Sequence, residues 1–128
     1  MVGPGIKKGT NYSLAHVMDI LPTCLEISKT SYPTIYKGNQ TNTLDGHSLV
    51  SIMKGKNATN YKDLFFEHEG GKALISGNYK IVALANEKWA LYDLSHDKTE
   101  TKNIILEKPQ KANEMISKWK QWAKQMGL

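Results

Sequence analysis

Apolar and polar residues follow a short, regular pattern in the second half of the chain. Between residues 63 and 94, apolar runs are separated by polar turns that contain Gly70-Gly71 and Gly77-Asn78. Such pairs accept positive φ and favour tight turns, and connections this short join antiparallel neighbours. Asn86-Glu87 makes a third turn. The pattern therefore predicts a meander of three to four strands, at residues 63–69, 72–76, 79–85 and 88–94.

The period of the apolar residues changes to 3.6 from Pro109 to Met126. Pro109 suits the first turn of a helix, and Gly127 suits the position beyond its last turn. A helix of this length, about 27 Å at 1.5 Å per residue, can cover one face of the meander. A basic helix with Trp can also lie on a membrane surface, but the sheet needs such a cover. The apolar stripe contains Ala112, Met115, Ile116, Trp119, Trp122, Ala123 and Met126.

The first half of the chain is less regular. Apolar residues at helical spacing surround Pro22, which restricts the residue before it, so we expect a regular helix at 22–29 after a loose turn. Residues 30–44 are polar and predict a loop, and residues 48–54 predict a short helix that ends at Gly55. The predicted fold class is α+β: an antiparallel three- to four-stranded meander packed against the long C-terminal amphipathic helix, with an N-terminal helix.

Composition narrows the classes of partner. The 128 residues contain 17 basic side chains, all Lys, and carry a net charge of +5. Bidentate reading of bases and phosphates is mainly the work of Arg, so we expect no nucleic-acid partner. No apolar run approaches 18 residues, so we expect no membrane partner. The single cysteine, Cys24, excludes an internal disulfide and is expected to be a small buried apolar side chain.

Several short motifs occur in a fixed order along the chain. They read H-x-x-D-x-x-P-T-x-L-E, then L-D-G-x-S-L, then E-x-x-G-x-x-A, G-x-Y-K, W-x-L-Y-D-L and D-x-T-E-x-x-N. Together they resemble the C-terminal portion of the arylsulfatase-type sulfatases, in the alkaline-phosphatase-like superfamily. The matching residues are His16, Asp19, Pro22, Thr23, Leu25, Glu26, Leu44, Asp45, Gly46, Ser48, Leu49, Glu67, Gly70, Ala73, Gly77, Tyr79, Lys80, Trp89, Leu91, Tyr92, Asp93, Leu94, Asp97, Thr99, Glu100 and Asn103.

The resemblance implies a division of the chain and a partner. Residues 1–44 would be the exit segment and helix of a catalytic domain that is otherwise absent, and residues 45–128 would be the C-terminal α+β subdomain. In the parent enzyme, which we expect to be extracytoplasmic, this fragment would complete the wall of the pocket for a sulfated substrate and stabilise the catalytic domain. An isolated fragment should expose an apolar patch and be able to self-associate, through Leu14, Val17, Met18 and Leu21.

The resemblance also implies which chemical groups lie elsewhere. Sulfatases hydrolyse their esters with a formylglycine made from Cys or Ser in C/S-x-P-S/A-R and with a divalent cation, usually calcium, held by oxygen ligands. Cys24 is followed by Leu-Glu-Ile, and the Asp-Asp, D-x-G-N and D-H-G metal motifs do not occur. We therefore expect no catalytic residue, metal ligand or cofactor in this chain, which should be inactive alone. Calcium and formylglycine are expected in the parent enzyme.

Candidate site residues lie near the first tight turn of the meander. His68 stands between Glu67 and Glu69, at the strand end that faces the substrate cleft in sulfatases. The resemblance implies that His68, together with Lys72, lines the substrate rim. The alternative is that His68 has a structural role or is merely exposed. Lys72 stands where the family often has Arg, and Lys cannot reproduce the bidentate contacts of Arg. The other histidines are expected to be hydrogen-bonded caps or surface residues: His16, His47 and His96.

Two other functions remain open at this point. The basic surface and the Trp residues could form an independent module that binds anionic glycans. An autonomous enzyme of another type would need converging titratable groups, and the sequence pattern does not indicate any.

Overall fold

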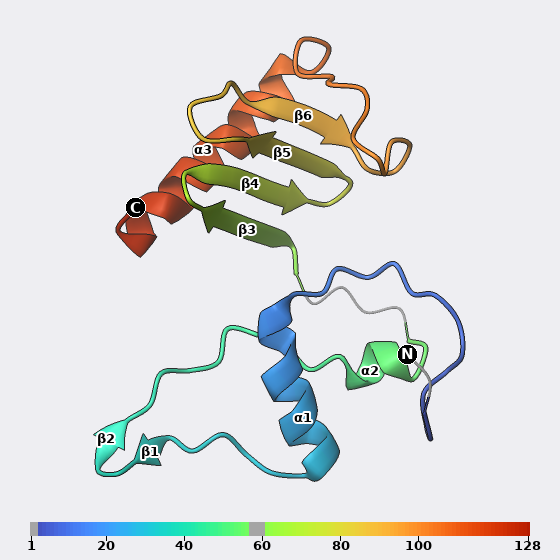
Figure 1. Cartoon of the computed structure of the whole chain (residues 1–128), viewed down its shortest axis with the longest axis vertical. Helices are drawn as coiled ribbons and strands as arrows, with labels where there is room; N and C mark the ends of the chain where they lie inside the picture. Colours follow the sequence, from blue (N-terminus) through green and yellow to red (C-terminus); the bar gives the residue numbers. More distant parts are fainter. Residues whose placement is uncertain (1–2, 57–60) are drawn as a thin grey trace. The chain divides into compact units, whose positions relative to one another are not determined.

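The structure, a computed structural model, describes residues 3–56 and 61–128. The chain divides into two compact units, Met1–Tyr61 and Lys62–Leu128, and each is described by itself. Figure 1 shows short helices in the first unit and a sheet backed by a long helix in the second. The predicted α+β class is therefore confirmed. The predicted domain boundary between residues 44 and 45 concerns the parent enzyme and stays a prediction.

The second unit holds a four-stranded antiparallel sheet in the spatial order β3-β4-β5-β6, which is also the order along the chain. The predicted meander is thus confirmed. One row of directly opposed apolar residues crosses all four strands, and opposed residues share a face. The row consists of Phe65, Leu74, Ile81 and Leu91. The strands are β3 (Asp63–His68), β4 (Gly71–Ser76), β5 (Tyr79–Ala83) and β6 (Ala90–Asp93).

One helix, α3 (Pro109–Met126), covers this row and completes the core (Figure 1). It has the bounds that the 3.6-residue period predicts. Gly127 follows with φ 79°, a left-handed conformation that glycine adopts without the strain of a β-carbon. The apolar stripe of α3 supplies its buried residues, namely Ala112, Met115, Trp119 and Ala123.

Both edges of the sheet are protected by hydrogen bonds. On edge strand β3, the Phe66 carbonyl accepts a hydrogen bond from Trp119 Nε1 at 3.0 Å. On edge strand β6, the Leu91 amide donates to Asn103 Oδ1 at 3.0 Å, and the Leu91 carbonyl accepts from the Ile104 amide at 2.8 Å. Unpaired edge groups can recruit other strands, so these contacts favour a closed second unit.

The first turn of the meander lies one residue earlier than predicted. The prediction placed it at Gly70-Gly71, but the residues with positive φ are Glu69 (50°) and Gly70 (82°), and Gly71 belongs to β4. Two successive positive φ angles match the twist of antiparallel strands. The Glu67 side chain accepts a hydrogen bond from the Gly70 amide at 3.0 Å. A side-chain acceptor therefore helps to fix a turn that a second glycine was expected to form.

The first unit consists of short elements. A 3-10 turn, η1, precedes the main helix, as the position of Pro22 predicts, and that helix begins two residues before the proline, within the first turn that tolerates it. The predicted loop at residues 30–44 contains a two-residue hairpin. The elements are η1 (Val17–Asp19), α1 (Ile20–Ser28), β1 (Ile35–Tyr36), β2 (Asn39–Gln40) and α2 (Val50–Met53).

The two units differ in how much apolar surface they bury. Among the described residues of the first unit, Val50, at 8% exposure, is the only buried apolar side chain. The other buried apolar residues of the described chain all belong to the second unit. The first unit must therefore be held together mainly by other contacts. In residues 3–56 and 61–128, no helix combines the length and the apolar character needed to cross a membrane.

We predict that Met115→Ala destabilises the second unit strongly. Met115 is 0% exposed in the core, so its truncation leaves a cavity and should lower the free energy of unfolding by about 2–5 kcal/mol. Urea unfolding followed by Trp fluorescence measures this, because all three Trp residues lie in the second unit.

Met126→Ala is the matched control. Met126 lies on the same helix but is 58% exposed, so its loss should change the free energy of unfolding by less than about 0.5 kcal/mol. Equal losses for the two variants would contradict the assigned core.

Candidate functional site

The predicted rim residues, His68 and Lys72, lie near one end of the sheet but on opposite faces. Lys72 is directly opposite Glu67, so these two residues share a face, whereas His68 is opposite Gly71. Neighbouring residues of a strand point to opposite faces. His68 is exposed and Lys72 is half-buried. The structure therefore does not bring the two side chains together on one face of the sheet.

Lys72 has a partner on the face that α3 covers. Its ammonium lies 5.7 Å from the ring centroid of Trp119, in a cation–π contact. Contacts of this kind contribute about 0.5–1 kcal/mol at exposed sites. Trp119 is itself fixed by the hydrogen bond to strand β3. Lys72 is therefore a positioned positive charge, while His68 is the more accessible of the two side chains.

The D-x-T-E-x-x-N motif fixes the loop after β6. The Asp97 carboxylate accepts hydrogen bonds from the amides of Lys102 at 2.8 Å and Thr101 at 3.1 Å. These bonds hold the pKa of Asp97 below its ordinary value. Glu100 lies in a left-handed conformation, φ 58°, and its carboxylate pairs with Lys80 at 2.6 Å. The carboxylates of this motif are thus engaged in contacts within the second unit, with backbone amides at Asp97 and with a lysine side chain at Glu100.

The first unit is organised around the buried carboxylate of Asp19, which is 0% exposed. Its Oδ2 accepts a hydrogen bond from the His16 amide at 2.8 Å. Its Oδ1 accepts one from the His47 amide at 2.8 Å and another from the Tyr61 hydroxyl. The two partners of Oδ1 lie 28 and 42 residues along the chain from Asp19. A single side chain therefore ties three distant segments together.

A second polar side chain and a glycine complete this arrangement. Thr23 Oγ1 donates to the Asp19 carbonyl at 2.6 Å and accepts a hydrogen bond from the Leu49 amide at 2.9 Å. A β-carbon at Gly46 would collide with the carbonyl oxygen of Met18, and the φ of Gly46 is not positive. Glycine is therefore required here for close approach of two backbones. The H-x-x-D-x-x-P-T and L-D-G-x-S-L motifs lie against each other.

The acid–base properties of Asp19 follow from these contacts. Burial alone would raise the pKa of its carboxyl, but the hydrogen bonds from Tyr61, His47 and His16 outweigh burial and lower the pKa below 3.8. Burial and the same contact raise the pKa of Tyr61 to about 12. A carboxyl with a depressed folded-state pKa stabilises the folded state above its unfolded pKa. This stabilisation is complete at neutral pH and is lost as the pH falls below 3.8.

The remaining histidines have the predicted structural roles. His16 caps η1, because its Nδ1 accepts a hydrogen bond from the Met18 amide at 3.4 Å. His47 and His96 are exposed, as predicted. The His47 ring lies 5.0 Å from the ring of Tyr61, between centroids.

Cys24 is exposed on α1, so the prediction that it is buried is wrong. The prediction assumed that this chain covers the apolar side of its own helix. Throughout residues 3–56 and 61–128, no three His, Cys, Asp or Glu side chains come close enough to hold a metal ion.

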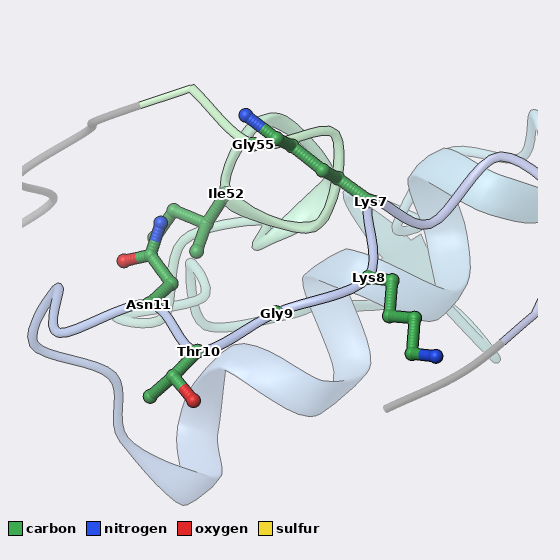
Figure 2. A pocket seen from close by; sticks show the side chains of 7 residues that line it. All are labelled: Lys7, Lys8, Gly9, Thr10, Asn11, Ile52 and Gly55. Carbon is green, nitrogen blue, oxygen red and sulfur yellow. The ribbon is translucent and has the colours of Figure 1, made fainter.

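The first unit has a hollow of about 160 Å³ that is lined by two lysines, so it is a candidate site for an anion. Figure 2 shows the Lys7 side chain running along Gly55, while Lys8 projects to the other side of the backbone. The Lys7 amide donates to the Met53 carbonyl at 2.9 Å, which holds this segment. The two positive charges diverge, so they do not form a joint site. The lining residues are Lys7, Lys8, Gly9, Thr10, Asn11, Ile52 and Gly55.

We predict that Asp19→Asn loosens the first unit. The change removes the negative charge of the group that accepts three hydrogen bonds. The free energy of local unfolding should therefore fall by about 1–3 kcal/mol. The His47 and Leu49 amides should then exchange their hydrogens about tenfold faster or more. In a pH titration by NMR, the His47 amide shift of the unmodified chain should move with a midpoint below pH 3.8, and that of the variant should not.

Asp45→Asn is the control for this prediction. Asp45 is exposed and precedes Gly46 in the same loop, so its neutralisation should leave both amide exchange rates and the titration unchanged. If the two variants behave alike, Asp19 does not hold the segments together.

Comparison with known proteins places the chain among sulfatases. It is 34% identical over 121 residues to an uncharacterized sulfatase of Schizosaccharomyces pombe. The match covers 88% of this chain and 22% of the yeast protein, so the chain spans less than a quarter of that relative. No family model matches the sequence.

Solved structures share the fold. A protein bound to its substrate, D-glucosamine-2-N,6-O-disulfate, is 20% identical with a TM-score of 0.59, over 84% of this chain and 23% of that one. A Bacteroides fragilis protein assigned as a sulfatase is also 20% identical, with a TM-score of 0.53, over 83% of this chain and 24% of that one. In sequence, motif order and fold, this chain belongs to the sulfatase family and corresponds to a C-terminal portion of such a protein.

Proposed function

We propose that this chain serves a sulfate-ester hydrolase as part of its substrate-pocket wall and as a support for its catalytic domain. The main support for this proposal is the 34% sequence identity with a sulfatase. This chain spans only 22% of the length of that sulfatase. The acidic side chains that could suggest catalysis, Asp19, Asp97 and Glu100, are engaged in structural contacts. On this proposal, calcium and formylglycine are supplied by the catalytic domain, which is the partner of this chain.

The proposed contact with substrate is the turn end of β3. His68 is exposed there and can donate a hydrogen bond to a hydroxyl of the leaving group, while the positive charge of Lys72 is held in place by Trp119. Because the two side chains lie on opposite faces, we assign the rim contact to His68 and an electrostatic contribution to Lys72. The solved relative with a sulfated sugar as its substrate supports a sulfated carbohydrate as the substrate class.

We predict that the isolated chain does not hydrolyse an aryl sulfate, with or without calcium. Its described residues contain no group of three His, Cys, Asp or Glu side chains that could hold a metal ion, and Cys24 lacks the motif needed for formylglycine. Release of the phenol, measured by absorbance, should equal the rate in buffer. Hydrolysis that increases with the concentration of this chain would refute the proposal.

A hybrid protein tests the positive part of the proposal. In it, this chain replaces the matched segment of the Schizosaccharomyces pombe sulfatase. The hybrid should hydrolyse the sulfate esters that the unmodified yeast protein hydrolyses. His68→Ala should raise its KM about 2–10-fold, the effect of one lost hydrogen bond.

His96→Ala is the control in the same hybrid, because His96 is an exposed histidine outside the proposed rim. It should leave KM unchanged. Unchanged KM in both variants would remove His68 from the rim, and a folded hybrid without hydrolysis would contradict the supporting role of this chain.

A further inference from the structure

We propose that an exposed apolar groove along α1 is the docking surface for the remainder of the sulfatase polypeptide, and that Cys24 lies inside this contact. The inference rests on the proposed function and specifies the surface through which the partner is held.

The groove lies between α1 and the segment 42–46 and encloses about 630 Å³. Three of its apolar side chains are largely exposed: Val17 at 71%, Ile20 at 58% and Leu21 at 45%. Val17 and Leu21 belong to the apolar patch predicted from the sequence, whose other members are half-buried. The groove is lined by Val17, Met18, Ile20, Leu21, Cys24, Tyr32, Asn42, Thr43, Leu44, Asp45 and Gly46.

The groove continues into a second hollow. This hollow encloses about 320 Å³ and reaches the base of the β1–β2 hairpin at Pro33 and Gln40. The two hollows share lining residues, so they form one continuous surface of the first unit. The shared residues are Tyr32, Asn42, Thr43 and Leu44.

The first unit needs an apolar cover that it does not supply. Val50 is its only buried apolar side chain among the described residues. Ordering the backbone costs conformational entropy, whereas removing a Val, Leu or Ile side chain from water stabilises the folded state. Covering Val17, Ile20 and Leu21 would therefore add a large stabilising contribution. The polar contacts of Asp19 position the helix, but they leave this side of it open to solvent.

The chemistry of the groove favours a protein surface of the same enzyme. Among the described residues that line it, Asp45 is the only charged one, and none is a Lys. A surface that binds membranes would carry basic residues beside its apolar ones. The chain also spans only 22% of its sulfatase relative, so most of a sulfatase polypeptide lies outside the matched segment and is available as the occupant.

Cys24 provides the test, because it is the single cysteine of the chain and lines the groove. A maleimide should modify Cys24 rapidly in the isolated chain. In the hybrid with the yeast sulfatase, the rate at Cys24, followed by peptide mass spectrometry, should fall at least about tenfold, as expected for a covered side chain.

The control moves the thiol away from the groove. Cys24→Ser combined with Ser117→Cys places it at an exposed position of α3 in the second unit. Its modification rate should be the same in the isolated chain and in the hybrid. A second variant, Leu21→Glu, should leave the unfolding of the isolated chain unchanged and lower the Tm of the hybrid, since only the hybrid buries this position.

The outcomes separate the inference from the proposed function. An active hybrid whose Cys24 reacts as fast as in the isolated chain overturns the groove contact and leaves the proposed function standing. A folded, inactive hybrid with protected Cys24 supports the groove and refutes the proposed function. Protection in the isolated chain that grows with its concentration assigns the groove to a second copy, and protection by phosphatidylserine vesicles assigns it to a membrane. Either result overturns the inference.

Discussion

The first unit depends on the hydrogen bonding of one buried carboxylate. An ionised side chain inside a protein is costly unless donors replace the water that it loses. For Asp19 one donor, the His16 amide, belongs to the same turn, whereas the His47 amide and the Tyr61 hydroxyl come from two distant segments. Val50 is the only buried apolar side chain among the described residues of this unit, so polar contacts are the main means of holding these segments beside α1. The carboxylate therefore couples the loop at 46–49 to α1, and the exposed groove beside α1 follows from that coupling.

The second unit is stabilised by an apolar core instead of a buried charge. The sequence predicts the fold of this unit well. Its strands alternate with period 2 and its helix with period 3.6, and both periods are local properties of the chain. Periodicity alone is therefore enough to place Met115 on the side of the helix that faces the sheet. The turn at Glu69-Gly70 could not be placed, because a side-chain acceptor on Glu67 replaces the second glycine that the pattern suggested. This shift of one residue places Gly71 in β4, opposite His68.

The features that the sequence did not predict arise from contacts over long separations or from the surroundings of an element. The bonds of Asp19 to residues 28 and 42 positions away have no periodic signature. The sequence indicates a capping role for His16, but it gives no sign that the Asp19 carboxylate also binds distant segments. For Cys24, periodicity identifies the apolar side of α1 correctly. It cannot reveal whether that side is covered within the chain, and the thiol is exposed.

The motifs that identify the family are explained here by structural contacts. Asp19, Thr23 and Gly46 bring two motifs into contact, and Asp97 and Asn103 fix the loop and the edge of β6. When the polar side chains of a motif form hydrogen bonds with the backbone, the motif is better evidence for a shared fold than for a shared reaction. These motif groups are engaged by internal partners, whereas His68 is exposed at a strand end. The resemblance to sulfatases therefore transfers the architecture first, because the motif residues that carry it hold the fold of each unit.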